Sequence, residues 1–158
     1  MIDSSIVRAH QHATTGRGLK KHVCGAKSGG LTTKLHCVTD GAGKPLKFEI
    51  TGGQTADCTQ AKSLLKGQKA KAVLADKGYD TDTIIQFIKH TMKAKAVIPP
   101  KRNRKVQWRY DKQLYKGRNL IERAFNKLKH WRRISTRYDR CDAMFIASIS
   151  LACIAIWA

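Results

Sequence analysis

Segments with strand periodicity alternate with segments of helical periodicity along this chain, and their order limits the fold more than any other feature. Ile2, Ile6 and Val7 predict a first strand. The β-branched runs 31–39 and 45–51 flank a Gly-rich turn and predict a β-hairpin. Short strands are expected at 70–75 and 95–98, and helices over 58–66, 83–92, 119–129 and 143–158. This order predicts an α/β fold, with a mixed central sheet and helices on both faces.

The remaining segments are polar or basic, apart from the end of the chain. Residues 10–30 are polar, basic and Gly-rich, which predicts a mobile loop. Residues 99–114 begin with two prolines and continue with many basic side chains, which predicts an irregular basic arm. The apolar segment 143–158 is slightly short for a membrane span, so a buried core helix is expected. The length of 158 residues suits a single domain.

The charge of the chain is its most unusual property. It has 31 Lys and Arg against 11 Asp and Glu, a net charge of +20. Such a balance predicts a polyanion partner, because Lys and Arg that neutralise phosphates release condensed counterions. A membrane surface or a ribosomal or chromatin-type packing role would also suit this charge. The basic residues are spread among ordered apolar segments, however, and this favours a folded nucleic-acid-binding protein without membrane attachment.

The five cysteines predict no disulfide framework. They show no CxxC spacing and follow no signal peptide, which is typical of reduced thiols in a cytoplasmic protein. A zinc site built from His22, Cys24, His36 and Cys37 is not favoured, because the spacing fits no known pattern of zinc ligands.

Three carboxylates stand apart from the others. Asp3 and Asp76 lie at strand edges beside apolar runs, and Glu122 lies on the predicted helix 119–129. Open α/β sheets bind ligands at the carboxyl ends of their strands, and three hard oxygen ligands suit Mg²⁺. A plainer alternative places Glu122 in a surface ladder with Arg118 and Asn126.

Five sequence blocks carry a family resemblance. The most specific is Tyr-x2-Arg-x3-Glu-x6-Lys, formed by Tyr115, Arg118, Glu122 and Lys129. The other blocks, in order, are residues 3–12 (DSSIVRAHQH), 29–36 (GGLTTKLH), 74–80 (LADKGYD) and 96–104 (AVIPPKRNR). Together they resemble the catalytic part of a bacterial insertion-sequence transposase of the DDE type, in the insertion-sequence-five group.

The resemblance implies an RNase H-like fold and a single DDE catalytic domain over residues 1–158. It implies that Asp3, Asp76 and Glu122 are catalytic and hold two Mg²⁺ or Mn²⁺ ions. The implied reaction is cleavage at the element's terminal inverted repeats, followed by attack of the freed 3′-hydroxyls on target DNA. By the same resemblance, Tyr115, Arg118 and Lys129 bind DNA phosphate near the ions.

Further DNA contacts are expected from basic side chains outside this motif, and they would be mainly to phosphate. They are expected in the arm and after the motif helix: Lys101, Arg102, Arg104, Lys105, Arg109, Arg132, Arg133 and Arg137. Trp108 and Tyr110 are interleaved with them, whereas Trp131 and Trp157 are expected in the core. The alternatives are a solvated basic loop and surface ion pairs.

The chain also departs from the family pattern. Complete members carry an N-terminal region that recognises the inverted repeats, whereas this chain starts two residues before Asp3. We therefore expect the downstream product of a split reading frame, which acts with the upstream product or as an oligomer at the bacterial nucleoid, or a decayed fragment. By itself it should bind DNA with little sequence preference and be weakly active or inactive in transposition. Two other functions remain open: an RNase H-like nuclease without strand transfer, and a non-catalytic basic DNA-binding protein.

Overall fold

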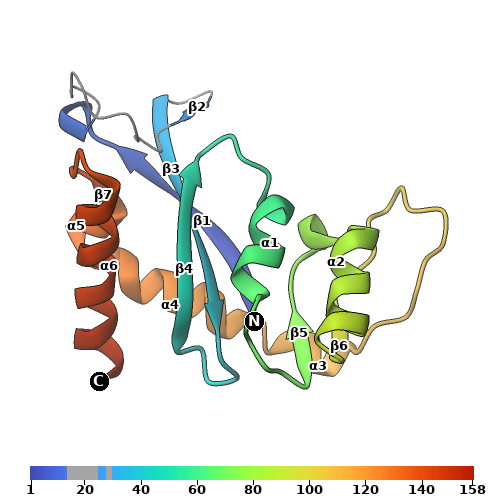
Figure 1. Cartoon of the computed structure of the whole chain (residues 1–158). Helices are drawn as coiled ribbons and strands as arrows, with labels where there is room; N and C mark the ends of the chain where they lie inside the picture. Colours follow the sequence, from blue (N-terminus) through green and yellow to red (C-terminus); the bar gives the residue numbers. More distant parts are fainter. Residues whose placement is uncertain (14–24, 28–29) are drawn as a thin grey trace.

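The computed structural model describes residues 1–13, 25–27 and 30–158 (Figure 1). The strands are β1 (Ile2–Ala9), β2 (Gly25–Lys27), β3 (Gly30–Thr39), β4 (Pro45–Gly52), β5 (Ala72–Leu74), β6 (Lys95–Val97) and β7 (Thr136–Arg137). The helices are α1 (Asp57–Leu65), α2 (Asp82–Gln86), α3 (Lys112–Lys116), α4 (Asn119–Lys129), α5 (Arg132–Ser135) and α6 (Asp142–Trp157). Further helical segments are the 3-10 turns η1 (Gln11–Ala13) and η2 (Lys77–Tyr79) and the π-helical turn η3 (Phe87–Thr91). The predicted α/β class, the first strand and the hairpin of β3 and β4 are confirmed.

The main sheet is mixed, as predicted. β1 and β4 flank β3 antiparallel, with Asp3 opposite Cys37, and β7 joins the far edge of β1 in parallel. β5 and β6 pair in parallel as a separate two-stranded sheet, so the described strands do not all belong to the main sheet. Strands of three residues carry too little pattern to specify a partner or a register. They attach to the main sheet by packing, since Ile2 of β1 and Val73 of β5 share one core cluster.

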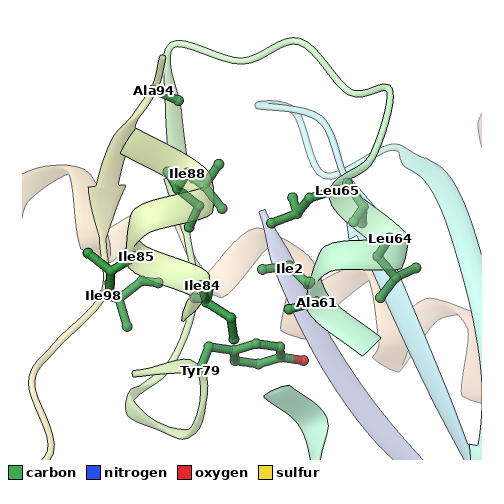
Figure 2. Close-up of a cluster of buried hydrophobic side chains, with 13 residues drawn as sticks. Ile2, Ala61, Leu64, Leu65, Tyr79, Ile84, Ile85, Ile88, Ala94 and Ile98 are labelled. Carbon is green, nitrogen blue, oxygen red and sulfur yellow. The ribbon is translucent and has the colours of Figure 1, made fainter. Parts of the chain in front are cut away.

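Helices cover both faces of the main sheet, which confirms the expected layers. On one face Ile2 lies between α1 and the α2 segment, and the ring of Tyr79 lies beneath it (Figure 2). On the other face Val7, Leu35 and Cys37 pack against α4, α5 and α6. Successive residues of β1 point to opposite faces, so Asp3 lies on the α4 face and Ser4 on the α1 face.

Helix α4 has the predicted apolar stripe. Ile121, Ala124, Phe125 and Leu128 are buried at the spacing of one helical face, and they pack on the sheet. The hairpin turn supports the start of this helix. Gly43 has a φ of +84°, and a Cβ there would lie 3.1 Å from the Leu120 carbonyl oxygen, so this close approach favours glycine. Glu122 stays at the edge of the buried stripe.

The acidic side chains at the starts of α1 and α2 suit the role of helix caps by residue type, but they do not cap these helices. Asp57 does not cap α1; its carboxylate accepts from Ser4 Oγ at 2.7 Å and pairs with Lys34 Nζ at 2.8 Å. Neither Asp80 nor Asp82 caps α2, because the Thr81 hydroxyl accepts from the Ile84 amide instead.

Several segments differ from their predicted environment. Helix α6 buries one face through Phe145, Ile149 and Ala152, but Met144 is 57% and Leu151 67% exposed, so a fully buried helix is wrong. Its composition is apolar all round and cannot indicate which face the sheet covers. No helix in the described part of the chain is both long and apolar enough to cross a membrane.

The two predicted irregular segments contain regular structure. Residues 10–30 include η1 and the paired strand β2, while 14–24 and 28–29, with His22 and Cys24, lie outside the described residues. The end of the arm forms α3, which Asp111 caps by accepting from the Leu114 amide at 3.0 Å. Of the two tryptophans expected in the core, Trp157 packs partly against it and Trp131 is 46% exposed.

Candidate active site

Arg118 joins two of the three candidate carboxylates. Its Nη1 donates to Asp3 Oδ2 at 2.8 Å, and its Nη2 donates to Glu122 Oε1 at 2.5 Å. Asp3 reaches this place from β1, and Arg118 and Glu122 reach it from adjacent turns at the start of α4. The structure therefore brings residues 115 positions apart in sequence into one ionic cluster. The alternative of a surface ladder on this helix does not account for all contacts of Arg118, because its side chain is only 20% exposed and also binds the sheet.

The environment of Asp3 opposes its ionisation. Burial is the largest cause and raises the pKa of Asp3 to about 6, while the Ser4 amide and Arg118 act in the opposite direction. The negative charges of Asp76 and Glu122 raise this pKa further, so both carboxylates lie within electrostatic reach of Asp3. A raised pKa caused by burial and by like charges is typical of functional sites.

Asp76 lies just beyond the carboxyl end of β5, as predicted, and begins the turn η2. Its Oδ1 accepts from the Gly78 amide at 2.8 Å, which fixes the carboxylate at the start of the turn. Tyr79 then enters the core against Ile2 and is 1% exposed. Burial, followed by the charges of Asp3, Asp57 and Asp76, raises the pKa of the Tyr79 hydroxyl. Tyr79 thus packs the segment of Asp76 against the strand of Asp3.

The three side chains supply the carboxylate oxygens that a divalent ion prefers, but their positions do not bring them together around one ion. Among the described residues, no three Asp, Glu, His or Cys side chains come close enough to hold one ion. Between Asp3 and Glu122, the positive charge is supplied by the Arg118 guanidinium. Arg118 therefore neutralises two carboxylates that would otherwise repel each other.

The other motif residues lie at different distances from this cluster. The Tyr115 ring on α3 lies 5.7 Å from the Arg118 guanidinium carbon and makes an edge contact with Tyr110. Lys129 lies seven residues after Glu122, which corresponds to about 10 Å along the helix. Lys129 is half-buried, and burial lowers its pKa. The structure thus groups Tyr115 with Arg118 and Glu122, and leaves Lys129 at the far end of α4.

The predicted DNA-binding residues of the basic arm divide into two groups. Arg102, Lys105 and Arg109 are exposed, and Lys101 is half-exposed. Arg104, in contrast, pairs with Asp80 and Asp82 and stacks on Trp108, with its side chain 20% exposed. Trp108 also donates from Nε1 to the Ile98 carbonyl at 3.1 Å and packs against the core. The arm is therefore anchored to the rest of the protein and is not simply a solvated basic loop.

The three arginines after the motif helix have different environments. Arg132 is exposed on α5, and Arg133 forms a two-pronged pair with the buried Asp139. Arg137 is 0% exposed and lies inside the protein, where its Nη1 donates to Thr33 Oγ1 at 3.0 Å and its Nη2 to Asp142 Oδ1 at 2.5 Å. The predicted contact of Arg137 with DNA is therefore wrong, because the side chain cannot reach a phosphate from this position.

A buried polar network, which the spacing of residues in the sequence does not predict, lies behind Asp3. Lys34 on β3 is almost fully buried, donates to the Thr55 carbonyl at 2.6 Å and pairs with Asp57, which also binds Ser4. Burial opposes ionisation of Asp57, but Lys34 and Ser4 bind the carboxylate and hold its pKa below the ordinary value. The signal in the sequence is the set of polar residues Thr32, Lys34 and His36 at alternate positions of β3, and it does not identify the partners. The network ties the residue after Asp3 to the start of α1.

Comparisons with known proteins agree with the motifs. The chain matches the family model described as the transposase DDE domain over residues 1–157. A Brucella ovis protein, named as the candidate transposase of insertion sequence element IS6501, is 44% identical over 128 residues, which cover 80% of this chain and 98% of that protein. A Burkholderia cepacia protein, named likewise for element IS402, is 29% identical over 133 residues, which cover 77% of this chain and 60% of that protein.

No solved structure matches the chain significantly. The family match spans nearly all of it, however, and the insertion-sequence relatives confirm the resemblance suggested by the motifs. The chain belongs to the transposase DDE domain family.

Proposed function

We propose that this chain is a transposase catalytic domain in which Asp3, Asp76 and Glu122 hold divalent metal ions against the DNA backbone. Membership of the family implies DNA transposition, and domains of this family generally use divalent metal ions. The observation that carries the proposal is the cluster of Asp3, Arg118 and Glu122, within electrostatic reach of Asp76. An RNase H-like fold is part of the proposal, supported by the mixed sheet with an acid on its first strand and helices on both faces.

The three carboxylates would reach the ions from three elements. When bound, Mg²⁺ or Mn²⁺ supplies positive charge that activates an attacking hydroxyl and stabilises the leaving oxygen. Asp3 would ligate from β1, Asp76 from the turn after β5 and Glu122 from the first turn of α4. Strand pairing fixes the backbone of Asp3, and the Gly78 amide fixes the carboxylate of Asp76. Both residues would therefore need to move little in order to bind an ion.

Arg118 would change partners when the carboxylates bind ions. Its guanidinium donates to the two carboxylates that would become ligands, so ligation releases these donors. A released guanidinium in this place can bind two oxygens of a DNA phosphate. The exposed basic side chains of the arm, together with Arg132, would hold the flanking phosphates.

The proposed reaction has two steps on DNA. Hydrolysis at the terminal inverted repeats would free a 3′-hydroxyl, which would then attack the backbone of target DNA. Complete end recognition is proposed to involve further copies of the chain. A nuclease would share the metal and the acids but would release cut DNA without joining it.

A strand-transfer assay separates these alternatives. We expect DNA that carries the element's end with a preformed 3′-hydroxyl to become joined to a plasmid, with Mg²⁺ or Mn²⁺ and the purified chain. The joined product should be absent when EDTA is added or when the end carries a 3′-deoxy nucleotide. Metal-dependent cutting without any joined product would favour the nuclease, and DNA binding without either product would favour a non-catalytic binding protein.

Replacing Arg118 by Gln should strengthen ion binding in the absence of DNA. The substitution removes a positive charge that contacts two of the proposed ligands, and we expect the affinity for Mn²⁺ to increase roughly tenfold. Titration of Mn²⁺ followed by electron paramagnetic resonance measures this affinity directly. Lys129→Gln is the matched control, with the same loss of charge about three turns along α4 from Arg118, and it should change the affinity little. Equal effects of both variants would exclude the specific role of Arg118.

A further inference from the structure

The basic arm is anchored to the segment that carries Asp76. Asp80 lies four residues after Asp76, on the other side of the turn η2, and its side chain is 0% exposed. Its Oδ2 accepts from the Lys101 amide at 2.7 Å, which fixes the beginning of the arm. Its Oδ1 has no hydrogen bond within the described part of the chain and lies 3.4 Å from Arg104 Nη1.

Arg104 supplies the charge that this buried carboxylate requires. A buried carboxylate without a cation is strongly unfavourable, and Arg104 is the cation that reaches Asp80 in the described structure. Its other terminal nitrogen pairs with Asp82 at the start of α2. The guanidinium carbon lies 4.1 Å from the centre of the Trp108 ring, so the aromatic face covers the ion pair.

The arm also closes on itself around this ion pair. Gln107 Nε2 donates to the carbonyls of Lys101 and Arg104, each at 2.9 Å. The Arg104 amide donates to the Lys101 carbonyl at 3.0 Å, and Trp108 binds the Ile98 carbonyl. Contacts at 98, 101, 104, 107 and 108 therefore hold the arm as a compact loop, while Arg102, Lys105 and Arg109 face solvent.

We propose that Asp80 and Arg104 are positioning residues, which fix the basic arm relative to Asp76 so that its outward Arg102, Lys105 and Arg109 bind DNA phosphates. The assignment rests on the proposed function for its DNA partner, but the anchoring of the arm is independent of DNA. Arg104 itself makes no phosphate contact, because both ends of its guanidinium are occupied by Asp80 and Asp82. Asp80 thus connects the turn that carries Asp76, a proposed metal ligand, to the basic surface that is proposed to bind DNA.

The test compares Arg104→Gln with Arg102→Gln, which removes the same charge from an exposed position on the same arm. Hydrogen exchange of peptides within residues 99–110, measured on the full chain without DNA, reports the anchoring. We expect Arg104→Gln and Asp80→Asn to increase exchange in this segment at least tenfold, and Arg102→Gln to leave it unchanged. If Asp80→Asn fails to fold, as shown by circular dichroism, Arg104→Gln decides the result, because the Arg104 side chain is partly exposed whereas that of Asp80 is fully buried.

The salt dependence of DNA binding then assigns the phosphate contacts. Each lost phosphate contact reduces the slope of log affinity against log salt by about 0.9. Arg102→Gln should reduce the slope by this amount, whereas Arg104→Gln should lower the affinity several-fold without changing the slope. An unchanged exchange rate together with a reduced slope in Arg104→Gln would overturn the proposal, because Arg104 would then be a phosphate contact. If exchange rises in Arg104→Gln but no arm variant changes DNA binding, the anchor stands and the proposed DNA surface fails.

Discussion

Replacing Glu122 by Gln is expected to reduce metal-dependent nicking of DNA by at least about a thousandfold, which corresponds to about 4 kcal/mol in the reaction barrier. The amide keeps the size of the side chain but loses the charge that would hold a divalent ion from α4. It also leaves Arg118 with Asp3 as its remaining carboxylate partner in the cluster. Asp76→Asn should have a similar effect, because it removes the ligand proposed at the end of β5. Nicking of supercoiled plasmid in Mg²⁺ or Mn²⁺ measures both losses.

The chain offers a matched control for this substitution. Glu49 on β4 is the other glutamate of the sequence, and it binds Ser63 at 2.6 Å and Lys47 at 3.2 Å, outside the cluster of Asp3 and Arg118. Glu49→Gln should nick DNA at the rate of the unmodified chain. If Glu122→Gln also retained this rate, Glu122 would not belong to the active site.

The second large effect concerns stability. Arg137→Ala is expected to lower the free energy of unfolding by about 3–5 kcal/mol, because it removes one partner of a buried ion pair and leaves Asp142 without that cation. The guanidinium also donates to the Thr33 hydroxyl and to the Asp139 carbonyl, and it lies 5.2 Å from the centre of the Phe145 ring. These contacts join β7, β3 and the start of α6. Urea denaturation at neutral pH measures the loss.

Arg132→Ala is the control for Arg137→Ala. Arg132 is exposed on α5, and its removal should change the free energy of unfolding by less than about 0.5 kcal/mol. Arg132→Ala should instead weaken DNA binding. The opposite pattern, with Arg137→Ala fully stable and deficient in DNA binding, would return Arg137 to the DNA-binding surface.

Local periodicity was sufficient to predict much of the fold. The apolar stripe of α4, the hairpin and the first strand follow from side-chain spacing within short windows, and the structure has all three. The placement of Asp76 after a short buried strand follows from the same pattern. The pairing of β5 with β6, and their separation from the main sheet, depends on contacts between distant segments that spacing does not encode.

The roles of individual arginines could not be predicted, because each depends on a partner far along the chain or on burial. Arg118 binds Asp3 across 115 positions, Arg137 binds Thr33 across 104, and Arg104 binds Asp82 across 22. In the sequence all three are basic residues in a basic region. Composition indicates a polyanion partner for the whole chain, but only the fold separates arginines that face solvent from those that neutralise buried carboxylates.

Iron-directed cleavage of the protein tests the shared metal site most directly. With hydrogen peroxide and ascorbate added, Fe²⁺ bound in place of Mg²⁺ reduces the peroxide to hydroxyl radicals, which cut the polypeptide near the ion, and ascorbate returns the iron to Fe²⁺. We predict cuts close to Asp3, Asp76 and Glu122, suppressed by excess Mg²⁺ and lost in Asp76→Asn. Cuts confined to other segments, or an unchanged pattern in Asp76→Asn, would contradict a metal site formed by these three carboxylates.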